Sequence, residues 1–78
     1  MEQFNINVSK DKSTYEFKVV DYVHHDGEQC KFEVFHEGRM VVSFEPDTHE
    51  YLRICKNPRI LDEDIIHLIA DKIESYHL

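Results

Sequence analysis

The sequence predicts a small α+β domain with two layers: an antiparallel meander of four to five strands, with one C-terminal helix packed on its apolar face. Before about residue 55, apolar and polar residues alternate in short runs, which is the period of strands with one buried face. After that point, apolar residues recur every three or four positions, which is the period of an amphipathic helix. A chain of 78 residues has room for one domain, so residues 1–78 are expected to fold as a single unit.

The first hairpin is defined by where its apolar residues fall. Pairing Ile6 with Phe17 across a four-residue loop at 10–13 collects the apolar side chains of both strands on one face. Two adjacent β-branched residues at 19–20 then interrupt the alternation, and a bulge near them would keep Asp21 out of the core. The strands are expected at about residues 3–9, 14–23, 30–35, 39–45 and 51–55.

The third turn contains a glycine. A three-residue loop at 36–38 sets Val34 opposite Met40 and keeps the apolar residues of both strands on one face. It also places Gly38 at a position that requires a left-handed backbone.

The end of the chain is expected to close the fold. The last strand pairs so that Phe44 lies opposite Leu52, and the helix spans about residues 62–77 with Asp62 as its N-cap. The apolar stripe of this helix consists of Ile65, Ile66, Ile69, Ile73 and Tyr76.

One helix is narrow for such a sheet. A helix is about 10–12 Å across, whereas five strands make a sheet roughly 20–24 Å wide. The sheet could curl around the helix, one edge strand could stay half-buried, or the uncovered part could be an interface or a groove.

Charge and composition exclude several classes of partner. The net charge is −7, from 16 acidic and nine basic residues, and no Lys/Arg-rich face can be drawn for nucleic acid or for an anionic membrane. The first residues lack the pattern of a signal peptide, and no apolar run is long enough to span a bilayer.

The two cysteines indicate the cellular compartment of the protein. Cys30 and Cys55 are too few for a disulfide scaffold, and the expected register places them on opposite faces of the sheet, where they could not bond. A reduced, cytoplasmic protein is therefore expected, with Cys30 in the core and Cys55 partly exposed.

No chemical motif is recognisable. The six histidines match no structural zinc pattern, no nucleophile has an oriented base beside it, and no glycine-rich loop could hold a phosphate. No catalytic, cofactor-binding or metal-ligating residue is assigned, and no enzyme activity is expected. The metal candidates considered are residues 24–26, the helical series Glu63, His67 and Asp71, and the pair His36 and His49.

The remaining interpretation is a protein-interaction or regulatory module without catalytic activity, either as a homodimer or with another protein partner. Phe35, Val41 and Tyr51 interrupt the polar face of the sheet and form the candidate interaction surface. Two alternatives stay open. One is a small-ligand or metal-binding protein that uses a groove beside the helix, and the other is an acidic inhibitor or antitoxin-like protein.

The layout resembles that of short uncharacterised bacterial proteins in which an antiparallel β-meander is followed by one C-terminal helix. The hairpin at residues 32–39 and the tail at residues 60–73 carry this resemblance. It implies the fold and carries over no activity, ligand or functional residue.

Overall fold

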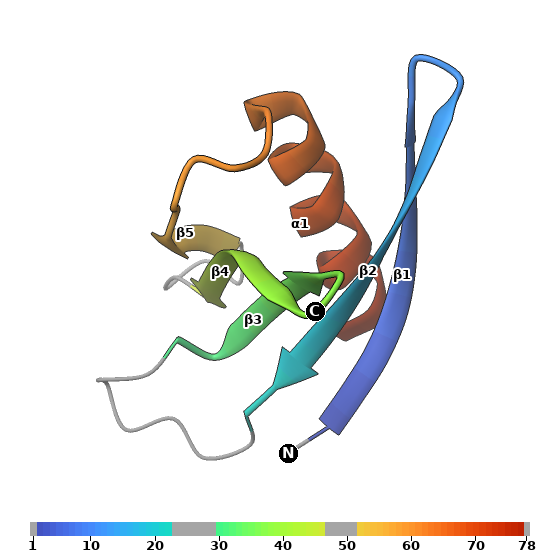
Figure 1. Cartoon of the computed structure of the whole chain (residues 1–78). Helices are drawn as coiled ribbons and strands as arrows, with labels where there is room; N and C mark the ends of the chain where they lie inside the picture. Colours follow the sequence, from blue (N-terminus) through green and yellow to red (C-terminus); the bar gives the residue numbers. More distant parts are fainter. Residues whose placement is uncertain (1, 23–29, 47–51, 78) are drawn as a thin grey trace.

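The computed structural model describes residues 2–22, 30–46 and 52–77. The described residues form one antiparallel sheet in the order β1-β2-β3-β4-β5, with one helix after it (Figure 1). The expected fold class, an α+β meander with a C-terminal helix, is therefore confirmed, and the element ends differ from the expected ones by at most two residues. The elements are β1 (Glu2–Lys10), β2 (Ser13–Asp21), β3 (Phe32–His36), β4 (Arg39–Pro46), β5 (Leu52–Lys56) and α1 (Glu63–His77).

The first hairpin has the expected register but a tighter turn. Ile6 pairs with Phe17, and the ladder continues down to Lys10 opposite Ser13. The turn is therefore the pair at residues 11–12, with φ angles of 52° and 68°, and the four-residue loop is wrong. Two successive left-handed residues are typical of a type I′ turn, whose twist matches that of the flanking strands.

The bulge expected near residues 19–20 is also wrong. β2 pairs without a register shift on both sides, so Asp21 does turn toward the interior and is 8% exposed. Its carboxylate accepts a hydrogen bond from the Lys31 ammonium at 2.7 Å. Lys31 also donates to the Tyr22 carbonyl at 3.2 Å, which holds the ammonium in place. A paired carboxylate at the sheet margin is tolerated where an unpaired one would be costly.

The β3–β4 turn differs from the expected three-residue loop. His36 pairs with Arg39, so the turn is the two-residue pair Glu37-Gly38, with φ angles of 54° and 80°. Gly38 is left-handed as expected. The register continues with Val34 opposite Val42, not Met40, because the turn is one residue shorter than expected and β4 contains one extra residue, Val41, at this point.

This bulge changes which side chains are buried. Val41 was expected on the polar face of the sheet, but it is 2% exposed and belongs to the core cluster. Ser43 is fully buried as well, between the buried Val42 and Phe44. The middle of β4 is therefore covered on both faces, which a strict two-residue alternation does not predict.

A second bulge brings the two cysteines together. Phe44 pairs with Ile54, not Leu52, and Ser43 pairs with Lys56, so Cys55 is the extra residue in β5. The Ser43 hydroxyl accepts a hydrogen bond from the Lys56 amide at 3.0 Å and donates one to the Cys30 sulfur at 3.3 Å. It thereby satisfies a backbone group that the bulge leaves outside the ladder.

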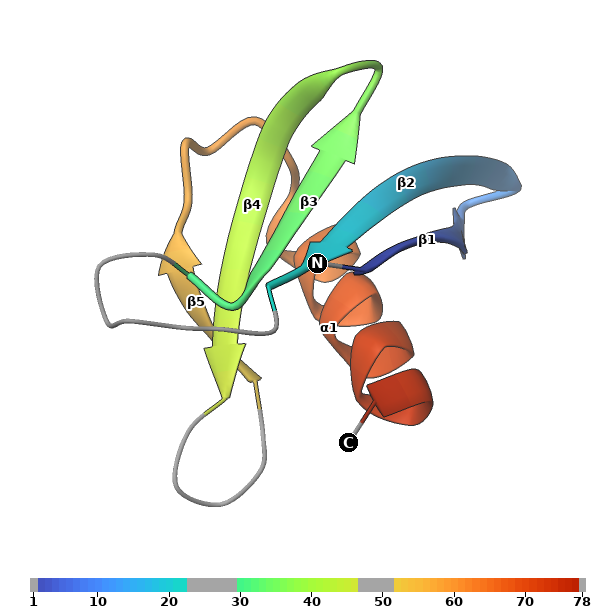
Figure 2. The ribbon, with the colours of Figure 1, turned by 90° about the horizontal axis from the view of Figure 1, so that it is seen from below.

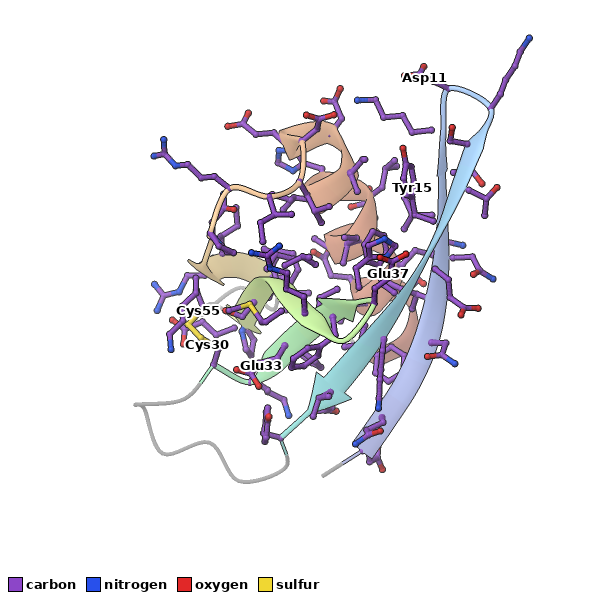
Figure 3. All side chains as sticks on the ribbon, viewed as in Figure 1. Asp11, Tyr15, Cys30, Glu33, Glu37 and Cys55 are labelled. Atoms are coloured by element: carbon purple, nitrogen blue, oxygen red, sulfur yellow. A yellow bond between two sulfur atoms is a disulfide. The ribbon has the colours of Figure 1, made fainter. Side chains whose placement is uncertain are left out.

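Cys30 and Cys55 form a disulfide, with their Cα atoms 6.0 Å apart (Figure 3). Two strands that flank a third are normally about 9.6 Å apart. The chain before β3 therefore crosses β4 toward β5, as Figure 2 shows. The expectation of two separate thiols on opposite faces is wrong, because it extrapolated the β3 alternation back to Cys30 and allowed no bulge at Cys55.

The core explains how one helix covers the sheet. Twist turns the β1–β2 hairpin away from β3 and β4, so that the sheet curves around α1 (Figure 2). The innermost side chains of β1 to β4 and of the helix are at most 6% exposed, whereas Ile54 of the edge strand β5 is 46% exposed. The curling of the sheet and the half-buried edge strand together explain how one helix covers the apolar face. The fully buried core includes Phe17, Val19, Phe32, Val34, Val42, Ile69 and Ile73.

The helix begins as its sequence predicts. The Asp62 carbonyl accepts a hydrogen bond from the Ile66 amide at 3.1 Å, which makes Asp62 the residue before the first helical turn. The four isoleucines of the expected stripe are buried. The helix lies against β1, so its docking positions one edge of the sheet.

Candidate functional site

The free side of β1 is the longer of the two edges of the described sheet. This strand is nine residues long and, within the described ranges, pairs only with β2. An edge strand presents a row of amide and carbonyl groups that another chain can complete. The candidate site is therefore this side of Glu2–Lys10, which we call the β1 edge.

The β1–β2 turn decides which residues of β1 point outward. In a two-residue turn, Lys10 and Ser13 form a hydrogen-bonded pair, and such pairs then alternate along an antiparallel ladder. The even-numbered residues of β1 therefore bond to β2. The outward backbone groups are those of Gln3, Asn5, Asn7 and Ser9.

Within the described residues, the β1 edge lacks the usual protection of an edge strand. Natural edges are kept short, bulged, or interrupted by proline and charge. β5, the opposite edge, follows this rule, with five residues, a bulge at Cys55 and the charged Arg53 and Lys56. β1 has a continuous nine-residue ladder, and its interior residues 3–9 are uncharged.

A groove lies beside the β1 edge on the helix face. It has a volume of about 430 Å³ and runs between β1 and α1. Val8 and Leu68 supply its apolar part, and Asp71 and Lys72 supply two opposite charges. An extended segment added to β1 would therefore place alternate side chains against the helix.

A second groove lies on the opposite face of the sheet. Its volume is also about 430 Å³, and it is open to solvent. Val20, Tyr22 and Phe35 form its apolar part, and the Tyr22 hydroxyl is held by a hydrogen bond to the Glu33 carboxylate at 2.5 Å. Gln3 of β1 also lines this groove, so the β1 edge has a hollow on each of its two faces.

The turn end of β1 carries a charge cluster. The Lys10 ammonium lies 3.1 Å from the Asp64 carboxylate and 3.9 Å from that of Asp62, at the start of α1. The hydrogen bond with Asp64 raises the pKa of Lys10 above 10.5. Desolvation opposes this shift, and the nearby charges of Asp64, Asp62 and Asp11 add to it. Lys10 therefore stays protonated and ties the helix to β1.

The structure describes two of the three residues predicted as an interaction surface, and one of these two is buried. Phe35 is half-buried in the open groove, whereas Val41 lies in the core and is removed from the candidate surface. Tyr51 lies outside the described residues. The expected meander already places its first strand at an edge, but alternation does not show that this edge is long and continuous or that grooves lie beside it.

The metal candidates that the structure describes do not converge on a common point. Of the described His, Cys, Asp and Glu side chains, no group of three is placed to hold a metal ion. The His36 ring lies 5.3 Å from that of Phe17, and its Nδ1 is 3.2 Å from the Glu16 carbonyl oxygen. Residues 24–26 and His49 lie outside the described ranges.

No helix within the described part of the chain combines the length and the apolar character needed to cross a membrane. Comparison with known proteins found no matching family model, no matching curated protein and no matching solved structure. The function therefore has to be inferred from the geometry of the chain itself.

Proposed function

We propose that this protein is an interaction module without catalytic activity, which binds a partner protein by adding an extended strand to the β1 edge. The observation that carries this proposal is the long, continuous and uncharged edge of β1. Strand addition takes its affinity from main-chain hydrogen bonds and its selectivity from pockets for alternate side chains. The two grooves beside β1 are such pockets.

The proposal retains the interaction module expected from the sequence and moves its surface. The outward groups of Gln3, Asn5, Asn7 and Ser9 replace the surface of Phe35, Val41 and Tyr51. The expected cytoplasmic location rested on the missing signal-peptide pattern and on two separate thiols. The Cys30–Cys55 disulfide removes the second support, because such bonds persist mainly in oxidising compartments.

Asn7→Pro is the variant that tests the site. The Asn7 amide points away from β2, so proline removes one outward donor and leaves the β1–β2 ladder intact. Asn7→Thr is the matched control, because it keeps the amide and favours a strand. Ile54→Thr is a second control, because it changes an exposed apolar residue on the opposite edge.

The probe is a displayed library of ten-residue peptides, selected against the chain immobilised at low density so that its copies cannot meet. We expect peptides with alternating apolar residues to be enriched. Their affinity should fall about tenfold with Asn7→Pro, the equivalent of one lost hydrogen bond, and stay unchanged in both controls. A library without enriched peptides, or peptides that bind Asn7→Pro equally well, would contradict the proposal.

A further inference from the structure

The residues of β1 are arranged symmetrically about Ile6. Phe4 and Val8 lie two positions to either side of it, and Asn5 and Asn7 lie one position to either side. The strand ends carry opposite charges, Glu2 at one and Lys10 at the other. A strand with this pattern is complementary to a second copy of itself that runs antiparallel. The geometry therefore points to a second copy of this chain as the partner at the β1 edge, an inference that rests on the proposed strand addition.

The hydrogen-bond pattern selects the register of this pairing. A two-fold axis at Ile6 sets Asn5 opposite Asn7 of the other copy and Gln3 opposite its Ser9, and all of these residues have outward backbone groups. Each such pair exchanges two bonds, so the two strands gain about eight backbone hydrogen bonds. A shift of the axis by one residue slides the two strands by two positions, which also pairs outward groups but shortens the ladder and leaves Glu2 without Lys10.

Side chains complement each other in the same register. On the helix face, Phe4 of one copy lies opposite Val8 of the other, which is a favourable aromatic and β-branched pair. Val8 also lines the groove beside α1 together with Leu68, so the half-buried Phe4 ring gains apolar cover there. On the opposite face, the carboxamides of Asn5 and Asn7 lie side by side and can bond to each other.

Charge opposes association overall and favours this register. Each copy carries −7, but at physiological ionic strength charges farther apart than about 8 Å are largely screened. Glu2 and Lys10 of the two copies are direct neighbours and are screened less. The Lys10 ammonium has three donors, so it can keep its Asp64 contact and still bind a second carboxylate.

Glu2 makes the register testable. In the single chain, Glu2 lies opposite Asp21, so Glu2→Lys exchanges a like-charge neighbour for an opposite one and should not destabilise the monomer. In the dimer, the same change sets the introduced ammonium against Lys10 of the other copy, at both ends of the paired strands. We expect the dissociation constant of the dimer to rise about tenfold in Glu2→Lys. The constant for Glu2→Gln should lie between those of Glu2→Lys and the wild type.

The first measurement is the solution mass by light scattering from micromolar to millimolar concentration, for the wild type, Asn7→Pro, Asn7→Thr and Glu2→Lys. A dimer is expected for the wild type and for Asn7→Thr. Asn7→Pro and Glu2→Lys should shift the equilibrium toward the monomer. The urea midpoint of each variant, measured at low concentration, shows whether its monomer remains folded.

The second measurement is a carbodiimide cross-link on a mixture of ¹⁴N and ¹⁵N protein. This reagent joins a carboxylate directly to an amine, and Glu2 and Lys10 of one chain lie about 26 Å apart along β1. A Glu2–Lys10 product must therefore be intermolecular, and it should carry mixed isotopes. The link between Lys10 and Asp64, which are 3.1 Å apart within one chain, is the internal positive control.

The outcomes separate this inference from the proposed function. A dimer with the Glu2–Lys10 link supports both. A monomer that still binds library peptides through the β1 edge overturns the second copy and keeps strand addition. A dimer that lacks the link and is indifferent to Asn7→Pro overturns the second copy as the partner of β1. The peptide selection then decides strand addition by itself.

Discussion

Gly38 has a left-handed backbone conformation that β-branched residues rarely adopt. Its φ is +80°, and a Cβ built at this position meets nothing within 4 Å. The cost of Gly38→Val is therefore backbone strain alone, and we expect a loss of about 1 kcal/mol or more in the free energy of unfolding. Urea denaturation measures it.

Gly38→Asn is the control for this prediction, because asparagine tolerates the left-handed region better than valine. It should cost clearly less. If both variants unfold at the wild-type midpoint, the left-handed turn at 37–38 is incorrect.

Single residues also explain where the register prediction failed. Val41 is one extra residue in the β3–β4 ladder and shifts the pairs that follow it, whereas Phe44 already pairs with Ile54 before the extra Cys55. The pattern Met40-Val41-Val42 contains apolar residues at successive positions, so either register buries some of them. Packing around β4 decides between the registers, and that packing is absent from the local sequence.

Among the elements, the contact between the β1 end and the start of α1 depends on the protonation of one side chain. The pKa of Lys10 is raised above its usual 10.5 in the folded chain. The contact therefore stabilises the fold fully below 10.5, and its contribution is lost as the pH rises through the raised pKa. Lys10 is partly exposed and its two carboxylate partners are exposed, so salt should weaken the contact as well.

Asp64→Asn tests this dependence. We expect it to be less stable than the wild type in urea near neutral pH, and the difference should vanish above the pKa of Lys10 and shrink in high salt. Glu63→Gln, in the same helical turn, is the matched control for loss of an N-terminal acid. A difference between Asp64→Asn and the wild type that is the same on both sides of the Lys10 pKa would contradict the assignment.

At the scale of the whole molecule, the disulfide compensates for small size. A domain of 78 residues buries a modest fraction of its surface and is marginally stable without further links. Cys30 and Cys55 are 25 residues apart, so their bond restricts the unfolded chain substantially. We expect Cys30→Ala/Cys55→Ala to lower the free energy of unfolding by about 3–4 kcal/mol.

Reduction is the control for this variant. Dithiothreitol should lower the urea midpoint of the wild type to near that of the double variant and leave the double variant unchanged. A loss below about 1 kcal/mol would mean that the link across β4 contributes little to the fold.

The sequence by itself determined the elements, the meander and the helix face. Alternation from Phe4 to Val8 and the spacing of Ile65, Ile69 and Ile73 are local signals of burial, and one face of each element has to be buried wherever it packs. The register of the first hairpin follows from the same signals, since only one pairing collects its apolar residues on one side.

Only the tertiary structure decided the two bulges, the Cys30–Cys55 bond and the grooves on the two faces of β1. Each depends on segments far apart in the chain: β4 is covered on both faces, the approach to β3 crosses it, and the helix and β2 form the grooves with β1. Hydrophobic periodicity reports burial residue by residue, whereas a groove or a cross-link is a property of neighbours in space. The candidate site therefore lay beyond a local pattern, although the symmetry of Glu2–Lys10 about Ile6 was visible in the sequence.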